Sequence, residues 1–322
     1  MNRLIRLWNQ NRKECIIGIV IFIAIIIIIQ VLNAFYARQS KETGKKEMVQ
    51  INSVEDVKNV SIEKDTTQEI TGSSEVSKKT EEQNVTVMKH FIQYCNEKDA
   101  EAAYNLLTKE SKEILFPTLE DFAQDYVQEY FQSSRGLDYE LWTTKGNTYT
   151  YKITLVNDAL AEGSLNTGNS YKDYFTVVAQ DGYWKLNVGG LIKYQDIDKT
   201  TEQQGLIWKV TGKEIYKDYE IYTLKVSNRS GKTIMLDPQL ESKSIFSTGD
   251  NNTTYTAFTH EIPRGNLILK DYGSSTLRIK FNKIYNKIDT TKITFSQIVK
   301  DYDSYVQNGQ TQDFAKVEIS IE

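Results

Sequence analysis

The chain has 322 residues, of which 25% are charged and 11% aromatic, and its formal net charge is −4. This length allows one to three domains, and the acidic balance argues against a nucleic-acid partner, which would need a basic surface to meet phosphates. The two cysteines, Cys15 and Cys95, lie in segments of different character, so no intramolecular disulfide is predicted.

An apolar segment near the N-terminus carries no charged residue from Cys15 to Tyr36. At about 1.5 Å per residue, a helix of this length spans roughly 33 Å, close to the hydrocarbon core of a bilayer at about 30 Å. A cleaved signal peptide would have a shorter apolar run followed by a small-residue cleavage site. The sequence therefore predicts one transmembrane helix, residues 15–36, preceded by a cytoplasmic tail, residues 1–14.

The charges that flank this segment do not decide its orientation. Four basic residues precede it and four follow it closely, namely Arg3, Arg6, Arg12 and Lys13 before it and Arg38, Lys41, Lys45 and Lys46 after it. The positive-inside rule is therefore balanced. Because the N-terminal tail is too short to fold, we expect the N-terminus inside and the C-terminal domains outside.

Residues 37–84 are predicted to form a disordered linker. The segment is rich in Lys, Glu, Ser, Thr, Gln and Val, and residues 39–84 contain no aromatic side chain. Such a composition cannot bury enough apolar surface to offset the entropy lost on ordering.

Residues 85–195 begin with helical patterns. Apolar residues recur at helical spacing from Val85 to Cys95, and Asp99 is placed to cap a second helix. Thr118 is placed to cap a third helix, and Asp121 can return a bond to the Thr118 backbone. The first domain is therefore expected to open with helices.

The period then changes to that of strands. Residues 148–155 alternate apolar and polar side chains, which predicts a half-buried strand. Asp181-Gly182 separates two further strand-like runs and predicts a tight hairpin. We expect helices followed by a curved antiparallel sheet.

The pattern F-x-x-x-C-x-x-K-D-x-E-A-A-Y-x-L-L-T, residues 91–108, resembles the helical opening of nuclear-transport-factor-2-like domains. The hairpin D-G-Y-W-K-L, residues 181–186, is similar to their last hairpin. The resemblance covers residues 85–195 and implies a cone-shaped α+β fold, in which helices close over a curved sheet.

The C-terminal region, residues 206–322, follows a second predicted linker, residues 196–205, and consists almost wholly of strand-like runs. Seven are predicted, at 207–211, 220–227, 233–236, 253–257, 275–281, 292–295 and 316–321. The pattern L-K-V-S-N-R-S-G-K-T-I, residues 224–234, is similar to immunoglobulin-like domains that follow membrane anchors in bacterial envelope proteins. An all-β immunoglobulin-like sandwich is the expectation.

The sequence offers few catalytic or metal-binding groups. A Ser-His-Asp or Cys-His arrangement would have to use His90 or His260, which lie in different predicted domains. We expect His90 at the surface or rim of its helix. The Asp301 and Asp303 pair lacks the glycine and distal glutamate of a calcium loop. No cofactor and no metal site are predicted.

One enzymatic alternative comes from the cone-shaped fold. The resemblance implies that an acidic base could face a tyrosine inside the cone, as in ketosteroid-isomerase-like relatives, with Asp99 or Asp125 as the acid. The candidate pocket residues are Tyr104, Tyr126, Trp142, Tyr151 and Trp184. The same aromatic side chains are equally explained as core filler.

Together these features predict a non-enzymatic, membrane-anchored binding or scaffold protein of the bacterial cell envelope. Its composition, rich in Ile, Lys and Asn, fits a low-GC Gram-positive origin. The expected partner is an envelope protein or a cell-wall component. Two alternatives stay open: a single-span component of a conjugation or type IV secretion system, and an isomerase- or dehydratase-like enzyme or small-ligand binder in the cone.

Overall fold

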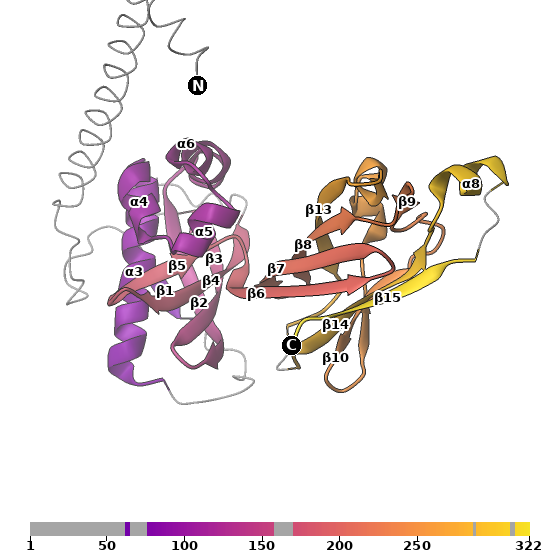
Figure 1. The fold of residues 1–322 in the computed structure, drawn as a ribbon. Helices are drawn as coiled ribbons and strands as arrows, with labels where there is room; N and C mark the ends of the chain where they lie inside the picture. The colour runs from indigo at the N-terminus through magenta and orange to yellow at the C-terminus, as the bar shows by residue number, and fades with distance from the viewer. Residues whose placement is uncertain (1–61, 65–75, 158–169, 286–287, 310–312) are drawn as a thin grey trace, which may run out of the picture. The chain divides into compact units, whose positions relative to one another are not determined.

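The computed structural model describes residues 62–64, 76–157, 170–285, 288–309 and 313–322. The predicted tail, the predicted transmembrane segment and most of the first predicted linker lie outside these residues. Among the described residues, no helix has both the length and the apolar character needed to cross a membrane. The protein is an α+β protein with mostly antiparallel sheets (Figure 1). We call residues 62–190 the α+β part and residues 191–322 the β part.

Helical segments open the α+β part, and side-chain caps explain where they begin. Asp99 accepts a hydrogen bond from the backbone N–H of Ala102 at 3.0 Å, and Thr118 forms a reciprocal capping box with Asp121, so both predicted caps are confirmed. The segments are α3 (Lys78–Asn96), α4 (Ala100–Leu106), α5 (Lys109–Ile114), α6 (Leu119–Phe122) and the π-helix η2 (Ala123–Gln128). The predicted disordered linker is wrong at two places, since residues 78–84 begin α3, which Ser77 caps, and residues 62–64 form a strand.

A five-stranded sheet with the order β1-β2-β3-β4-β5 completes this part. The first strand pairs parallel with the second, and the remaining neighbours are antiparallel. The predicted hairpin is confirmed, since Asp181 and Gly182 both have positive φ and join paired strands. The strands are β1 (Ile62–Lys64), β2 (Arg135–Lys145), β3 (Thr148–Asn157), β4 (Tyr171–Gln180) and β5 (Tyr183–Asn187).

Phe91 on α3 lies where helices and sheet meet. Its ring centroid is 6.1 Å from that of Phe122, 5.7 Å from that of Tyr126 and 5.6 Å from that of Phe175 on β4. All four side chains are buried. The helices therefore pack on one face of the sheet around a single aromatic core.

The β part has two four-stranded sheets that bury their inner faces in one common core. Their orders are β13-β8-β7-β6 and β11-β10-β14-β15, and a short pair, β12-β9, lies beside them. The strands are β6 (Leu191–Gln203), β7 (Leu206–Tyr216), β8 (Glu220–Asn228), β9 (Ile234–Met235), β10 (Ile245–Gly249), β11 (Thr254–Thr256), β12 (Ile268–Leu269), β13 (Ser274–Phe281), β14 (Thr290–Ile298) and β15 (Ala315–Ser320). Three short helical segments interrupt them, η3 (Thr259–Glu261), η4 (Arg264–Leu267) and α8 (Tyr302–Gln307).

Several elements of the β part differ from the sequence prediction. Residues 196–203, which we assigned to a linker, belong to β6. This strand lies at a sheet edge with mostly exposed polar side chains, and for that reason its sequence reads as a linker. Strands β10 and β12 and the helical segments η3, η4 and α8 were not predicted.

A register shift in the β7–β8 pairing reverses the faces of β7. Before the shift, Trp208 and Val210 face the core. The shift lies between Val210 and Gly212, and beyond it Lys213 pairs directly with the buried Tyr222. Because directly paired residues share a face, the bulge turns a lysine toward the interior.

An ion pair lies buried at this end of the core. The Nζ atom of Lys283 is 2.6 Å from Oε1 of Glu220, and their side chains are only 2% and 3% exposed. The second carboxylate oxygen of Glu220 accepts hydrogen bonds from Tyr222 at 3.0 Å and Thr290 at 3.3 Å. Burial lowers the pKa of Lys213, and the charge of Glu220 opposes that shift. Among the described residues, Lys283 is therefore the direct ion-pair partner of Glu220, and Lys213 interacts with the same carboxylate through its charge.

Replacing one member of this pair should destabilise the protein strongly. Lys283→Met leaves a buried carboxylate without its cation, which should lower the free energy of unfolding by about 3 kcal/mol. Adding Glu220→Gln should recover part of that loss, because no buried carboxylate then lacks its cation, although Lys213 loses the nearby negative charge. The matched control is Lys109→Met in the exposed Lys109–Glu113 pair, which should change stability by less than about 0.5 kcal/mol. Urea unfolding measures all three, and an equal loss in the single and double variants would contradict the account.

Candidate functional site

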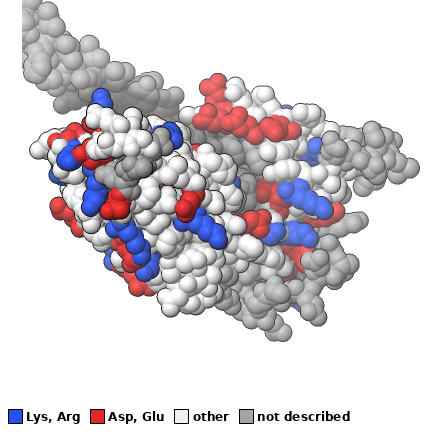
Figure 2. All heavy atoms as spheres, turned by 90° about the vertical axis from the view of Figure 1, so that its right-hand side faces the viewer, with Lys and Arg blue, Asp and Glu red and all other residues white. Residues whose placement is uncertain are grey.

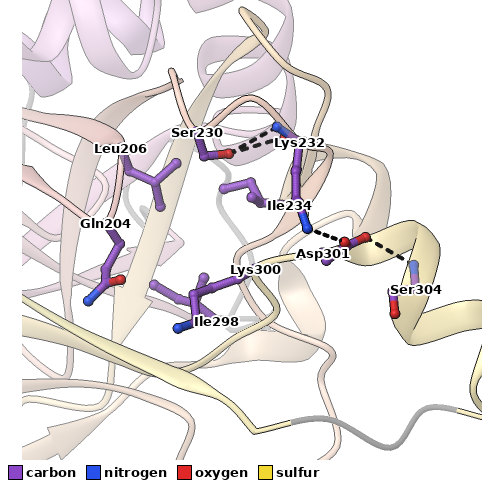
Figure 3. Close-up of a pocket in the computed structure, with 9 residues that line it drawn as sticks. All are labelled: Gln204, Leu206, Ser230, Lys232, Ile234, Ile298, Lys300, Asp301 and Ser304. Carbon is purple, nitrogen blue, oxygen red and sulfur yellow. Dashed lines mark hydrogen bonds and ion pairs between the residues drawn. The ribbon is translucent and has the colours of Figure 1, made fainter.

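A pocket opens at one end of the β part, with a volume of about 570 Å³ (Figure 3). Its floor consists of Leu206, Ile234 and Ile298, all members of the buried core of the β part. The remaining lining residues are polar or charged: Gln204, Ser230, Lys232, Lys300, Asp301 and Ser304. The pocket is thus a hollow with a polar rim, and buried core residues form its floor.

Local backbone geometry brings the pocket walls together. Gly205 lies in the turn between β6 and β7 with φ +70°, a conformation that favours glycine. A Cβ atom there would lie 2.9 Å from the Cα atom of Ser230, so only glycine allows the two loops to approach so closely. The backbone N–H of Arg229 donates to the carbonyl of Gly205 at 2.7 Å. The turn and the loop after β8 are therefore joined.

Asn228 fixes the loop after β8. Its side-chain amide donates to the carbonyls of Lys232 at 2.7 Å and Leu269 at 3.0 Å. Its Oδ1 atom accepts from the backbone N–H of Ser230 at 2.9 Å. Asn228 is fully buried, so these bonds form away from water and hold the loop in one conformation.

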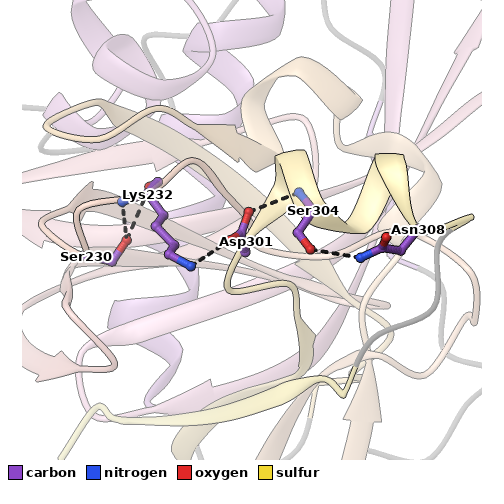
Figure 4. Close-up of polar contacts among 5 residues, drawn as sticks. All are labelled: Ser230, Lys232, Asp301, Ser304 and Asn308. Atoms are coloured by element: carbon purple, nitrogen blue, oxygen red, sulfur yellow. Dashed lines mark hydrogen bonds and ion pairs between the residues drawn. The ribbon is translucent and has the colours of Figure 1, made fainter.

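One wall of the pocket is a continuous chain of polar contacts (Figure 4). The Nζ atom of Lys232 is 2.6 Å from Oδ2 of Asp301, and Oδ1 of Asp301 accepts from the backbone N–H of Ser304 at 3.0 Å. The Ser304 hydroxyl accepts from Asn308 at 3.0 Å. The hydrogen bond from Lys232 lowers the pKa of Asp301, and the Ser304 bond adds to the effect. Lys232 and Asp301 therefore neutralise each other.

The opposite wall has polar groups without partners. Within the part of the chain that the structure describes, neither Lys300 nor Gln204 makes a hydrogen bond or an ion pair. Figure 3 shows both side chains beside the opening, across from Lys232 and Asp301. Both side chains are exposed, so the Lys300 ammonium and the Gln204 amide are accessible to a ligand that enters the pocket.

The five predicted pocket residues lie in the α+β part and do not surround the pocket described above. Tyr104 and Tyr126 both contact Phe122, with ring centroids 5.7 Å and 5.5 Å away. Tyr151 is buried in the same core and accepts a hydrogen bond from Asn84 at 3.0 Å. A ligand pocket among these residues stays a prediction.

The two tryptophans of that set lie apart from each other. Trp184 packs on Tyr149 at 5.8 Å, against the same core. Trp142 packs on Tyr174 at 5.1 Å. Because Tyr174 alternates with the core residue Phe175, Trp142 lies on the opposite face of the sheet. The structure therefore brings four of the five aromatic residues to one core and leaves Trp142 outside it.

The two histidines also lie apart. His90 is only 7% exposed, so its predicted position at the surface or rim of the helix is wrong. Residues 84–88 and 90–92 of α3 are all buried, so this stretch of the helix is covered on more than one side, His90 included. His260 is exposed in η3. Among the described residues, no group of three or more His, Cys, Asp or Glu is arranged to hold a metal ion.

The buried carboxylate of the α+β part was not anticipated. Asp99 caps a helix and Asp125 is exposed, whereas Asp173 is only 7% exposed on the core face of β4. Its carboxylate accepts backbone hydrogen bonds from Gly189 at 2.9 Å and Tyr174 at 2.7 Å. The sequence does carry a signal for this buried acid, because Asp173 alternates with the apolar residues Phe175 and Val177 in a strand-like run.

Burial raises the pKa of Asp173 to about 7, although the backbone hydrogen bonds oppose the shift. Gly189 and its neighbour Gly190 both have positive φ, so the carboxylate holds a turn that requires glycine. Burial also raises the pKa of the Tyr126 phenol, and the charge of Asp173 raises it further. Asp173 therefore links the buried face of β4 to the turn after β5 through hydrogen bonds.

The raised pKa of Asp173 makes stability depend on pH. Because the folded pKa of about 7 exceeds the unfolded value of 3.8, the native state holds more protons between these values, so stability falls as pH rises from about 4 to about 7. The loss is on the order of 4 kcal/mol. Asp173→Asn should flatten this slope in urea midpoints, whereas Asp125→Asn, an exposed control, should not. An unchanged slope in Asp173→Asn would contradict the assignment.

Comparison with known proteins gives no further guide to the site. The chain matches no family model, no curated protein and no solved structure. The function of the pocket in the β part must therefore be argued from its own geometry. That geometry combines a core-derived apolar floor, a fixed polar wall and an unpartnered cation.

Proposed function

We propose that this chain is a membrane-anchored binding protein of the bacterial cell envelope, with its N-terminus in the cytoplasm and its two folded parts outside. The anchor is the charge-free segment from Cys15 to Tyr36. The observation that carries the binding role is the pocket of the β part, in which a fixed wall faces the unpartnered Lys300 and Gln204. A pocket whose walls are held before binding loses little entropy when a ligand enters.

The finer fold assignments belong to this proposal. Helices over one face of a largely antiparallel sheet support a nuclear-transport-factor-2-like domain in the α+β part. Two four-stranded sheets around one core support an immunoglobulin-like domain in the β part. The parallel strand β1 and the helix α8 are additions to those simple patterns.

The conjugation or secretion alternative has less support. A second cone-shaped domain in residues 206–322 would open with helices. The described residues of that region begin with strands, and their only α-helix is α8, with six residues. The β part therefore lacks the repeated cone that would favour this alternative.

One observation favours an isomerase-like enzyme or small-ligand site in the cone as a second candidate. The hydroxyl of Tyr126 is buried without a hydrogen-bond partner among the described residues, and the charge of Asp173 raises its pKa. A buried phenol and a buried acid are the groups such an enzyme would use. Against it, the Asp173 carboxylate already accepts two backbone hydrogen bonds. The pocket of the β part is therefore the stronger candidate.

Labelling in intact cells tests the proposed topology. Asn251 is exposed in the β part and Gln10 lies in the N-terminal tail. A cysteine in Asn251→Cys should react with a membrane-impermeant maleimide in intact cells, because that residue should be outside. A cysteine in Gln10→Cys should react only after lysis, and the parent chain controls for Cys15 and Cys95. The reverse pattern would overturn the proposed orientation.

Chemical crosslinking tests the proposed partnership. The full chain should be crosslinked in intact cells with an impermeant reagent and then purified by an affinity tag. We expect envelope proteins or cell-wall fragments to be recovered, because the folded parts should face them. Purification without the reagent is the control. Recovery of cytoplasmic proteins alone would contradict an envelope role.

A further inference from the structure

We infer that the pocket of the β part binds a compact ligand with one carboxylate, or a similar single anionic group, on a short apolar body. The inference rests on the proposed binding function and names the ligand class of that site. Its basis is the juxtaposition of three features: the apolar floor, the neutralised wall and the unpartnered Lys300.

The floor calls for an apolar body. Leu206, Ile234 and Ile298 are 1%, 2% and 1% exposed, so only the outermost atoms of these core residues reach the pocket. Further apolar surface comes from the alkyl stems of the lining residues Lys232 and Lys300, which a short apolar body can contact. The volume of about 570 Å³ falls within the range of about 300–1,000 Å³ typical of small-molecule sites.

The charges call for one anionic group. Lys232 and Asp301 cancel, so the ammonium of Lys300 is the charge in the pocket that remains uncompensated among the described residues. Gln204 can donate an amide N–H to the same anion. A ligand cation would meet two lysines, and a neutral ligand would leave the charge of Lys300 unused.

A polyanion fits less well. On the face shown in Figure 2, Lys and Arg side chains are interspersed with Asp and Glu, and no broad area of positive charge is present among its described residues. The chain as a whole carries a formal charge of −4. Binding of a long anionic polymer depends on many cations acting together. A single carboxylate needs only one.

The experiment uses the full chain in lipid nanodiscs, with empty nanodiscs as the blank. Isocaproate is the probe and isocaproamide its uncharged isostere, and ligand-observed NMR measures the dissociation constants. A peptide ending in a free leucine carboxylate, with its C-terminal amide as control, tests whether the carboxylate belongs to a chain end. We expect one or both carboxylates to bind and both amides to bind at least about fivefold more weakly.

Two variants tie the binding to the pocket. Lys300→Gln should weaken carboxylate binding about fivefold, whereas Lys270→Gln should not, because Lys270 is exposed but does not line the pocket. Asp301→Asn should strengthen binding about two- to fivefold, because it removes a negative charge and releases Lys232. Thermal melts of each variant check that the fold is kept.

Three outcomes would overturn the inference. The first is that neither carboxylate binds at concentrations up to about 10 mM, a dissociation constant that corresponds to a binding free energy of about −2.7 kcal/mol. The others are equal binding of acid and amide, and equal effects of Lys300→Gln and Lys270→Gln. If the carboxylates do not bind but crosslinking still recovers envelope partners, the ligand class is rejected and the proposed function is retained.

Discussion

The packing of β7 is the constraint on which both ends of the β part depend. A strand in a two-layered structure must turn apolar side chains toward the core, and β7 does so from Leu206 to Val210. At its first residue the core ends, and Leu206 becomes part of the pocket floor. Beyond the bulge the faces reverse, and Lys213 turns inward beside Glu220. One strand therefore contributes to the pocket at one end of the core and to a buried charge cluster at the other.

Helix caps and turn residues predicted much of the secondary structure, because the interactions behind them involve residues close together in the sequence. Asp99 and Thr118 each accept a hydrogen bond from a backbone N–H in the first turn of the helix that follows, which depends only on nearby residues. Asp181-Gly182 likewise favours positive φ whatever the surrounding structure. Strand β6 escaped prediction because its pairing with β7 stabilises it, while its own polar side chains resemble those of a linker. The inward turn of Lys213 also depends on a register shift, which no local pattern reports.

The candidate site was harder to predict than the fold. Aromatic residues such as Tyr126 and Tyr151 drew attention as pocket candidates, yet large apolar side chains are also the commonest core filler, and both are buried in the core. The pocket of the β part is assembled from three segments, around Gln204, Ser230 and Lys300, that are distant in the sequence. A lysine without a partner is recognisable only when its surroundings are known.

The central claim is that ligand binding takes place at the end of the β part and not inside the α+β part. Hydrogen–deuterium exchange on the full chain in nanodiscs, with and without isocaproate, tests it most directly. The account predicts slower exchange in peptides that cover 228–234 and 298–308, because a bound ligand would hold the loops around the pocket. Slower exchange in residues 119–131 instead, with these loops unchanged, would contradict it and favour a site within the cone.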